Sequence, residues 1–357
     1  MSDPTIQTFC CHHTGSREDM AVRIMEEFNT KSYNIVCLVS STIGILGSIY
    51  QILPCKTSSH IDRLHNIKST RGRHLIIWLA VADLLASFGV LVRSSLWLKY
   101  KSIMPLPDDD ISVLFCSITS AWTQYFYTAT WFWTLFYAID TLRTIKGRDF
   151  HPILYHSIAW GVPAATTGIG LSILYIPNAK CHNLKSVTSA LFKILPNYCA
   201  TYLPIAIVMI VNPVLYVLAS KEVETTVALP LAQFTSKERR VVDALKLKFF
   251  LINVVFYVCW LPNLVNGVLV WTMWFNMPVK IIISIWYIMA LMNPMQALFN
   301  ALVYRRWNTN SSRYRPTFSS MHKEFNLHNE QSPLLGSEPP RLPLSPLPPG
   351  INSYATL

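Results

Sequence analysis

An ionisable side chain inside an apolar stretch is the first feature of this sequence that indicates chemistry. Asp83 lies within the apolar stretch 74–97, about nine residues from its amino-terminal end, which corresponds to roughly 14 Å along a helix. Asn293 and Pro294 lie at a comparable depth from the carboxy-terminal end of the stretch 279–303. Because a carboxylate in apolar surroundings needs a polar partner, we expect Asp83 to form a cluster with Asn293, Asn300, water or a sodium ion. The alternative is an aspartate that water satisfies and that only supports helix packing.

Arg93 is a second charged side chain inside the same stretch. Its planar guanidinium can hold a ligand carboxylate with two parallel hydrogen bonds, although a long basic side chain can also extend to the lipid headgroups. Other polar residues lie in the matching halves of two further apolar stretches, and pockets between helices with aromatic walls and a few polar groups commonly bind small molecules. The predicted ligand-binding residues are Arg93, Gln124, Asn263 and Asn266.

The string Cys259-Trp260-Leu261-Pro262 lies in the stretch 247–271. A proline removes one backbone hydrogen bond from a helix, and a large ring beside the resulting kink gives an element that a ligand can shift between two arrangements. The alternative is aromatic packing beside a structural kink. The predicted switch comprises Asp83, Trp260, Pro262, Asn293 and Pro294.

Charged side chains also gather where two of the apolar stretches end. Asp140 and Arg143 are three residues apart, so they share one helix face and can form an ion pair. Together with Glu238, Arg239 and Arg240 they predict a docking surface for a partner protein. Ordinary positive charge on the cytosolic side explains any single one of these residues equally well.

The elements that position these residues follow from composition. Only 14% of the 357 residues are charged and 52% are hydrophobic, whereas a soluble domain averages about 25% charged residues. This composition argues against a soluble enzyme and against a disordered chain. We predict an all-α membrane protein, a bundle of seven transmembrane helices, because a bilayer-crossing helix needs about 20 mainly apolar residues and seven stretches qualify: 33–53, 74–97, 113–139, 153–176, 198–219, 247–271 and 279–303.

The lysines and arginines of the connecting segments predict the orientation. Twenty lie on one side and nine on the other, so the positive-inside rule places the amino terminus in a lumen or outside and the carboxy terminus in the cytosol. Their position in short segments between apolar stretches argues against nucleic-acid binding. The predicted parts are a lumenal or extracellular segment 1–32, a seven-span domain 33–304 and a cytosolic tail 305–357.

Two cysteines fall on the predicted lumenal side, Cys116 at the end of a span and Cys181 in a loop. Because that compartment is oxidising, we predict a disulfide bond between them that holds the loop across the bundle; the alternative is two free thiols. Neither His74 nor His156 has a histidine or carboxylate one turn away on its own helix, as a zinc hydrolase would need. We also find no Gly-x-Ser-x-Gly string and no glycine-rich phosphate loop, so we predict neither an enzyme nor a metal site, and no cofactor apart from the sodium ion considered at Asp83.

The tail contains many prolines and polar residues and is predicted to be disordered. It also contains Glu330 four residues before the pair Leu334-Leu335. An acidic residue at this spacing resembles the acidic dileucine signal that clathrin adaptors bind. The sequence therefore predicts sorting between the plasma membrane and an organelle.

With these residues in view, the chain resembles the ocular albinism type 1 receptor family of seven-span G protein-coupled receptors, from about Phe9 to Tyr304. The resemblance lies in Thr8-Phe9-Cys10-Cys11, Val92-Arg93-Ser94-Ser95-Leu96-Trp97-Leu98, ILYHSIAWG (153–161), YIPNAKC (175–181), Thr201-Tyr202-Leu203-Pro204, Val211-Asn212-Pro213, Glu238-Arg239-Arg240 and Met292-Asn293-Pro294-Met295-Gln296.

The resemblance implies a receptor of lysosome, late-endosome or melanosome membranes that cycles through the plasma membrane. It implies a tyrosine-derived agonist such as L-DOPA, coupling to heterotrimeric G proteins through the surface of Asp140, Arg143, Arg239 and Arg240, and contacts with clathrin adaptors and arrestin. The chain departs from rhodopsin-class receptors in reading Asp140-Thr141-Leu142 where an arginine would follow the acidic residue, and in lacking a tyrosine after Asn293-Pro294. Two alternatives from other classes are a solute transporter and a non-signalling organelle scaffold.

Overall fold

The computed structural model describes residues 24, 26–53, 63–100, 110–148, 151–175, 187–228, 236–273 and 278–330 of the chain. This part of the protein contains seven long helices and no strand: α3 (Thr30–Ile52), α4 (Arg63–Lys99), α5 (Asp110–Ile145), α6 (Pro152–Tyr175), α7 (Val187–Ala228), α8 (Ser236–Thr272) and α9 (Val279–Glu330). The prediction of an all-helical fold is confirmed for these residues.

Five of the helices are long and apolar enough to cross a membrane: α3, Arg71–Lys99 of α4, Leu195–Thr225 of α7, Val242–Thr272 of α8 and Val279–Tyr304 of α9. Seven spans were predicted, so α5 and α6 fall short of this criterion. α5 contains a series of threonines whose hydroxyls donate to backbone carbonyls three or four residues earlier and so remain hydrogen-bonded within the helix. These residues are Thr119, Thr123, Thr128, Thr134 and Thr141.

The helices continue through their prolines. Pro163, Pro204, Pro213 and Pro262 all lie inside helices. A proline inside a helix leaves the carbonyl four residues earlier without its usual backbone donor, and in a bundle a neighbouring helix can supply a replacement.

Side chains from neighbouring helices fill two of these gaps. The Tyr257 hydroxyl of α8 donates to the Met209 carbonyl of α7 at 2.7 Å, which is the carbonyl that Pro213 leaves free. The Ser40 hydroxyl of α3 donates to the Ala290 carbonyl of α9 at 2.6 Å, four residues before Pro294. These bonds connect α7 with α8 and α3 with α9 at their bends.

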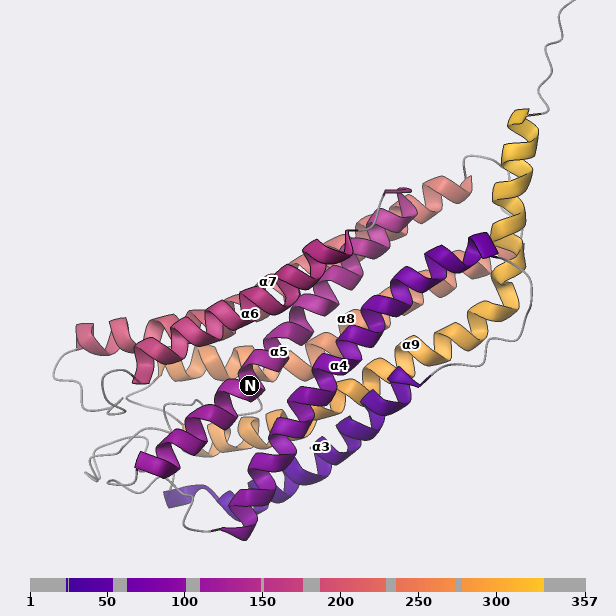
Figure 1. Cartoon of the computed structure of the whole chain (residues 1–357). Coiled ribbons are helices and arrows are strands. Elements are labelled where there is room, and N and C mark those ends of the chain that lie inside the picture. Colours follow the sequence, from indigo (N-terminus) through magenta and orange to yellow (C-terminus); the bar gives the residue numbers. More distant parts are fainter. Residues whose placement is uncertain are drawn as a thin grey trace, which may run out of the picture. The chain divides into compact units, whose positions relative to one another are not determined.

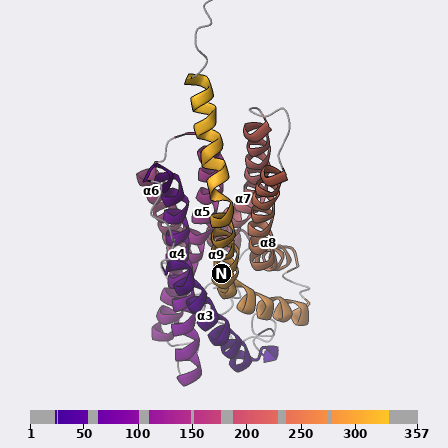
Figure 2. The same cartoon turned by 90° about the vertical axis from the view of Figure 1, so that its right-hand side faces the viewer.

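Within the compact unit of residues 1–315, the helices lie side by side as a bundle (Figures 1 and 2). Neighbouring pairs include α3–α4, α4–α5, α5–α6, α5–α7, α6–α7 and α7–α8. Glycines allow α3 to approach α9 closely, because a Cβ at Gly44 would collide with the Pro294 carbonyl and one at Gly47 would lie 2.6 Å from the Leu298 backbone. This close approach holds the proline bend of α9 against α3.

Two apolar clusters fill the bundle. One contains Trp131, Trp260 and Trp286, and the other contains Trp133 and Tyr304. Along α4 the two clusters meet at Asp83, since Ala82 belongs to the second cluster and Ala86 to the first. The buried carboxylate therefore lies at the boundary between two apolar layers.

The helix α9 continues to Glu330, whereas we predicted a disordered tail from residue 305. Residues 305–330 thus differ from the prediction. An existing helix can lengthen without a new nucleation step, which explains how a polar segment follows the last span in helical form. Residues 316–357 form a separate compact unit, of which 316–330 are described and helical. The proline-rich segment after residue 330 lies outside the described residues.

Candidate functional site

Asp83 binds two side chains from two other helices. It is 2% exposed, its Oδ1 accepts from the Thr130 hydroxyl of α5 at 3.1 Å, and its Oδ2 accepts from the Asn300 Nδ2 of α9 at 3.1 Å. Asn293 is also buried and lies two turns before Asn300 on the same face of α9. The structure thus brings Asp83 together with Asn300. Thr130 was not predicted, because only the rotation of α5 about its axis shows that this threonine faces Asp83.

Trp260 lies fully buried at the centre of the bundle. Its ring makes edge contacts with Tyr127 and Trp131 of α5 at centroid distances of 5.0 and 4.9 Å, and its indole N–H donates to the Gln296 Oε1 of α9. Pro262 lies two residues further along α8. The ring therefore connects α5, α8 and α9 beside the proline bend. Gln296 was not predicted, although its place one turn after Asn293 was a signal that could have identified it.

The predicted ligand residues all lie buried in the half of the bundle where α4 ends and α5 begins. The Gln124 Nε2 of α5 donates to the Thr201 hydroxyl of α7 at 3.0 Å. The Asn266 Oδ1 of α8 accepts from the indole N–H of Trp286 on α9 at 2.9 Å. Asn263 lies one turn before Asn266 and is equally buried.

Arg93 lies inside the bundle as well. Its guanidinium carbon is 5.6 Å from the centroid of the Trp97 ring, a distance at which a cation and an aromatic face attract each other. The side chain is buried, which fits a position inside the bundle better than extension to the lipid headgroups. The common role of Arg93, Gln124, Asn263 and Asn266 in ligand binding stays a prediction.

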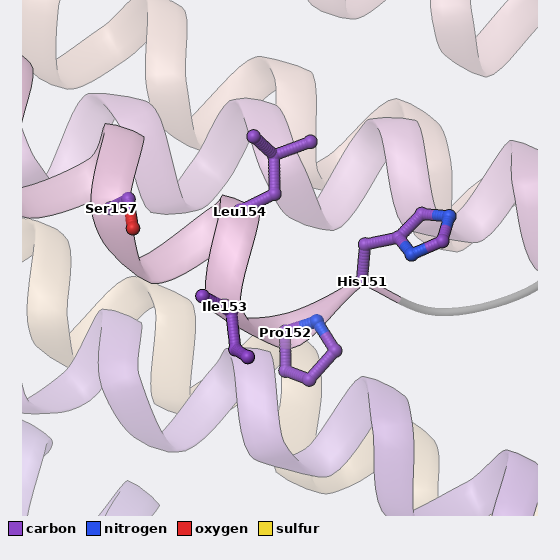
Figure 3. Close-up of a pocket in the computed structure, with 5 residues that line it drawn as sticks. All are labelled: His151, Pro152, Ile153, Leu154 and Ser157. Carbon is purple, nitrogen blue, oxygen red and sulfur yellow. The ribbon is translucent and has the colours of Figure 1, made fainter.

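A surface pocket lies at the start of α6 and does not include any predicted ligand residue. Figure 3 shows its lining: His151, Pro152, Ile153, Leu154 and Ser157. Ile153 is 81% exposed, and exposed aliphatic side chains on a helix of a membrane bundle face lipid tails. We therefore do not assign the ligand site to this pocket.

The amino-terminal part of α4 and the carboxy-terminal part of α5, on the predicted cytosolic side, are joined by an ion pair. The Arg71 Nη2 lies 2.9 Å from the Asp140 Oδ1, and the Arg71 Nη1 donates to the Arg148 carbonyl at 3.2 Å. We predicted a pair of Asp140 with Arg143 on the same helix. Sequence spacing finds partners within one helix but cannot find Arg71, which reaches Asp140 from another helix. The side chains of Glu238, Arg239 and Arg240 lie outside the described residues.

Two histidines from different helices meet inside the bundle. The Nε2 atoms of His74 on α4 and His156 on α6 are 3.2 Å apart, and the Trp78 indole N–H donates to the His74 Nε2 at 3.2 Å. The rings of Trp133 and Trp160 lie close by. No group of three or more His, Cys, Asp or Glu side chains that could hold a metal ion exists among the described residues.

The remaining predicted residues are only partly covered. Cys116 is disulfide-bonded, while Cys181, its predicted partner, lies outside the described residues. The same holds for Leu334, Leu335 and the side chain of Glu330. Free and buried thiols are found at Cys37 and Cys259.

The comparison with known proteins decides the family. The family model described as ocular albinism type 1 protein matches residues 1–331. The chain belongs to this family. The human G-protein coupled receptor 143 is 26% identical to this chain over 324 residues, which cover 86% of this chain and 78% of the human protein. The cyclic AMP receptor-like protein C of Dictyostelium discoideum is 22% identical over 201 residues, 54% of this chain and 53% of that protein.

The ocular albinism type 1 match covers all of the predicted site residues except Leu334 and Leu335, which follow residue 331. The resemblance inferred from the motifs is thereby confirmed. The chain departs from the rhodopsin pattern at Thr141 and at Ala297. Beside the first departure the structure supplies another contact, the ion pair of Arg71 with Asp140.

Proposed function

We propose that this ocular albinism type 1 family member is a G protein-coupled receptor of organelle and plasma membranes. It binds a tyrosine-derived agonist such as L-DOPA in the predicted lumenal half of the bundle and signals through a heterotrimeric G protein at the opposite end. The name of the human relative, G-protein coupled receptor 143, supports the receptor class. Five apolar helices support a multi-pass membrane protein.

One observation carries the proposal: a chain of contacts leads from the ligand half to the buried carboxylate. Tyr127 of α5 contacts the Trp260 ring, and Trp260 binds Gln296 of α9. Asn300 lies one turn further along α9 and binds Asp83. Each step links a different pair of helices or follows one rigid helix.

An agonist acts on this chain by changing the position of Trp260. A ligand between Gln124 and Asn266 lies on the predicted lumenal side of the Trp260 ring and favours one of the two orientations of that ring. Rotation of the ring breaks its bond to Gln296 and lets α8 bend at Pro262, which moves the cytosolic end of α8. A ligand shifts such an equilibrium only through its different affinity for the two arrangements.

The test uses a receptor that stays at the cell surface because Leu334 and Leu335 are both replaced by alanine. G-protein activation is measured against a panel of aromatic amino acids and amines that includes L-DOPA. We expect a saturable response to tyrosine-derived compounds. In the same background Trp260→Phe retains a ring but loses the donor to Gln296, so it should reduce the maximal response more than ligand binding. A surface-expressed receptor that answers none of these compounds would overturn the proposed function.

Sorting forms part of the proposal. Clathrin adaptors bind the Glu330 and Leu334-Leu335 signal and direct the receptor to lysosome, late-endosome or melanosome membranes, and arrestin binds the activated form. Leu334→Ala with Leu335→Ala should move the receptor toward the plasma membrane in surface biotinylation, whereas Leu344→Ala, another tail leucine, should not. Equal surface fractions for both variants would remove the signal from the proposal.

A sodium ion at Asp83 is a further element of the proposal. Each carboxylate oxygen accepts one hydrogen bond in the structure, and a carboxylate oxygen has a second lone pair for a cation. Asp83→Asn removes the negative charge and retains one side-chain oxygen. It should therefore abolish any dependence of agonist affinity on sodium concentration. Sodium dependence that survives in Asp83→Asn would exclude this site.

A further inference from the structure

The described residues directly before α3, residues 24 and 26–29, form an amino-terminal segment that packs against the bundle. Ile24 and Phe28 are 1% and 5% exposed and belong to one of the two apolar clusters of the bundle. They are four residues apart and so share one face of a helical turn, whereas Glu26 and Glu27 are exposed. The segment therefore has an apolar inner face and a charged outer face.

The Phe28 ring lies among three other aromatic rings. It makes an edge contact with Trp286 of α9 at 5.4 Å between ring centroids, and tilted contacts with Tyr33 and Tyr287 at 5.1 and 6.1 Å. The Trp286 indole N–H donates to the Asn266 Oδ1 at 2.9 Å, and Asn266 is one of the predicted ligand residues. A single side chain, that of Trp286, thus connects Phe28 with the predicted ligand site.

The junction between this segment and α3 allows the segment to move as a unit. Phe28 and Asn29 are not helical. The Asn29 Oδ1 caps α3 by accepting from the Ser32 N–H at 3.1 Å, and the Asn29 carbonyl accepts from the Tyr287 hydroxyl at 3.1 Å. Both bonds lie on the α3 side of the junction, so a rotation of the backbone before Asn29 leaves the helix and its cap intact.

The closed arrangement of the segment depends on few contacts. Its inner face contributes two apolar side chains, and closing also fixes backbone whose freedom is regained on opening. The two contributions oppose each other, and a segment with few buried contacts opens locally at a lower cost than the whole fold. Because Glu26 and Glu27 face water in the closed arrangement, opening does not take a charge out of an apolar environment.

We propose that the amino-terminal segment is a lid over the predicted lumenal end of the bundle, which opens by rotation before Asn29 and admits ligands past Trp286. The inference rests on the proposed function only in naming what enters. A ligand binds through the open arrangement, so its association rate is proportional to the fraction of open lids. A bound ligand leaves through the same opening, and the lid therefore governs how fast ligands exchange more than how tightly they bind.

The thiol of Cys37 reports on the lid without any ligand. Cys37 is 3% exposed, belongs to the same apolar cluster as Phe28, and lies one turn after Tyr33, whose ring packs against Phe28. The purified full chain in detergent is treated with a positively charged methanethiosulfonate, and modification of Cys37 is followed over time by peptide mass spectrometry. Phe28→Ala should speed this modification at least about tenfold, because loss of a buried ring destabilises the closed arrangement and not the open one.

Matched variants separate the lid from general damage to the bundle. Ile24→Ala shortens the other inner side chain and should speed Cys37 modification at least about threefold, whereas Glu27→Ala changes the outer face and should leave the rate unchanged. Phe136→Ala removes a ring of similar burial, 6% exposed, from the other apolar cluster; it should lower the melting temperature without faster Cys37 modification. Cys259, which is 0% exposed, should stay unmodified over the same period in every variant, which excludes unfolding.

The same variants are then compared in the exchange of L-DOPA. Phe28→Ala should raise the association and the dissociation rate constants by about the same factor as it speeds Cys37 modification, and it should change the dissociation constant less than about threefold. Glu27→Ala and Phe136→Ala should leave both rate constants unchanged. A purely structural role of Phe28 would weaken binding without faster association.

The outcomes distinguish the lid from the proposed function. Equal rates of Cys37 modification in the native chain, Phe28→Ala and Ile24→Ala would show that the segment is a fixed part of the core, and the lid would be refuted. Faster modification with unchanged L-DOPA rate constants would refute the role of the lid in ligand entry, while the proposed function stands. If no form binds L-DOPA but Phe28→Ala speeds Cys37 modification, the proposed ligand class fails and the lid stands.

Discussion

The ion pair between Arg71 and Asp140 should stabilise its end of the bundle more than any exposed pair on the same side. The Arg71 side chain is 14% exposed and that of Asp140 3%, and their atoms are 2.9 Å apart. Lys146 and Glu222 form a pair on the same side of the bundle with a distance of 3.7 Å, and these side chains are 41% and 37% exposed. The two pairs thus differ mainly in burial.

The expected magnitudes follow from that difference. Removal of one partner from a buried pair costs about 3–5 kcal/mol, whereas an exposed pair is worth about 0–1 kcal/mol. Because Arg71 retains some contact with water, we expect Asp140→Asn to cost about 2–3 kcal/mol and Glu222→Gln at most about 0.5 kcal/mol. Replacement of both partners by apolar residues, Arg71→Met with Asp140→Leu, should cost less than Asp140→Asn alone, since no uncompensated charge is then left in the bundle.

The assay is thermal unfolding of the purified receptor in detergent. A loss of about 2 kcal/mol lowers the melting temperature of a medium-sized domain by about 4–8 °C, so Asp140→Asn should melt clearly below the native receptor and Glu222→Gln within about 2 °C of it. The double variant should lie between Asp140→Asn and the native receptor. Equal melting temperatures for Asp140→Asn and Glu222→Gln would refute the assignment of Arg71 as the partner that Asp140 needs.

Three further predictions concern contacts between helices. Gly44→Ala places a Cβ against a backbone carbonyl of α9 and should lower the melting temperature by the equivalent of about 1–3 kcal/mol, whereas Gly161→Ala, with nothing within 4 Å, should not lower it. Lys248 lies 5.5 and 5.7 Å from two tyrosine rings, on α5 and α9; Lys248→Gln removes cation–π attraction of about 0.5–2 kcal/mol and should raise agonist-independent G-protein activation about 2- to 30-fold. Tyr257→Phe removes the donor to the carbonyl that Pro213 leaves free and should cost about 1 kcal/mol in thermal unfolding.

The sequence predicted where helices exist better than where they end. Hydropathy placed a span at 198–219, but α7 runs from Val187 to Ala228, and α8 likewise begins at Ser236 rather than near 247. A hydropathy pattern marks the apolar part that fits the hydrocarbon layer, whereas a helix continues wherever its backbone bonds are made, including through charged segments such as Lys237 to Lys246. The ends of the apolar stretches are therefore poor guides to the ends of the helices.

The site shows a similar division between depth and direction. Depth along a helix is a count of residues, and this count predicted Asn293 at the level of Asp83. In the structure the α9 residue that binds Asp83 is Asn300, two turns further along the helix. Direction depends on how each helix is rotated by its neighbours, and a single sequence does not contain this information. Thr130 and Arg71 were missed for that reason: both bind a predicted residue from a different helix. The pairing of His74 with His156 was missed in the same way.

The departure from the rhodopsin pattern at Thr141 suggests that a polar contact can be retained when one of its residues lies on another helix. Where an arginine would follow Asp140 on α5, this chain has Thr141, and the carboxylate instead binds Arg71 from α4. Such a pair still binds a buried carboxylate at this end of the bundle, but it connects α5 to α4 instead of joining two residues of α5. The helix most affected by its release is then α4, which also carries Asp83 and Arg93. Because these three charged residues lie along one helix, a shift of α4 along its axis would change the contacts of all three at once. Disruption of the Arg71–Asp140 pair should therefore change the hydrogen bonds of Asp83 more directly than the contacts of Trp260.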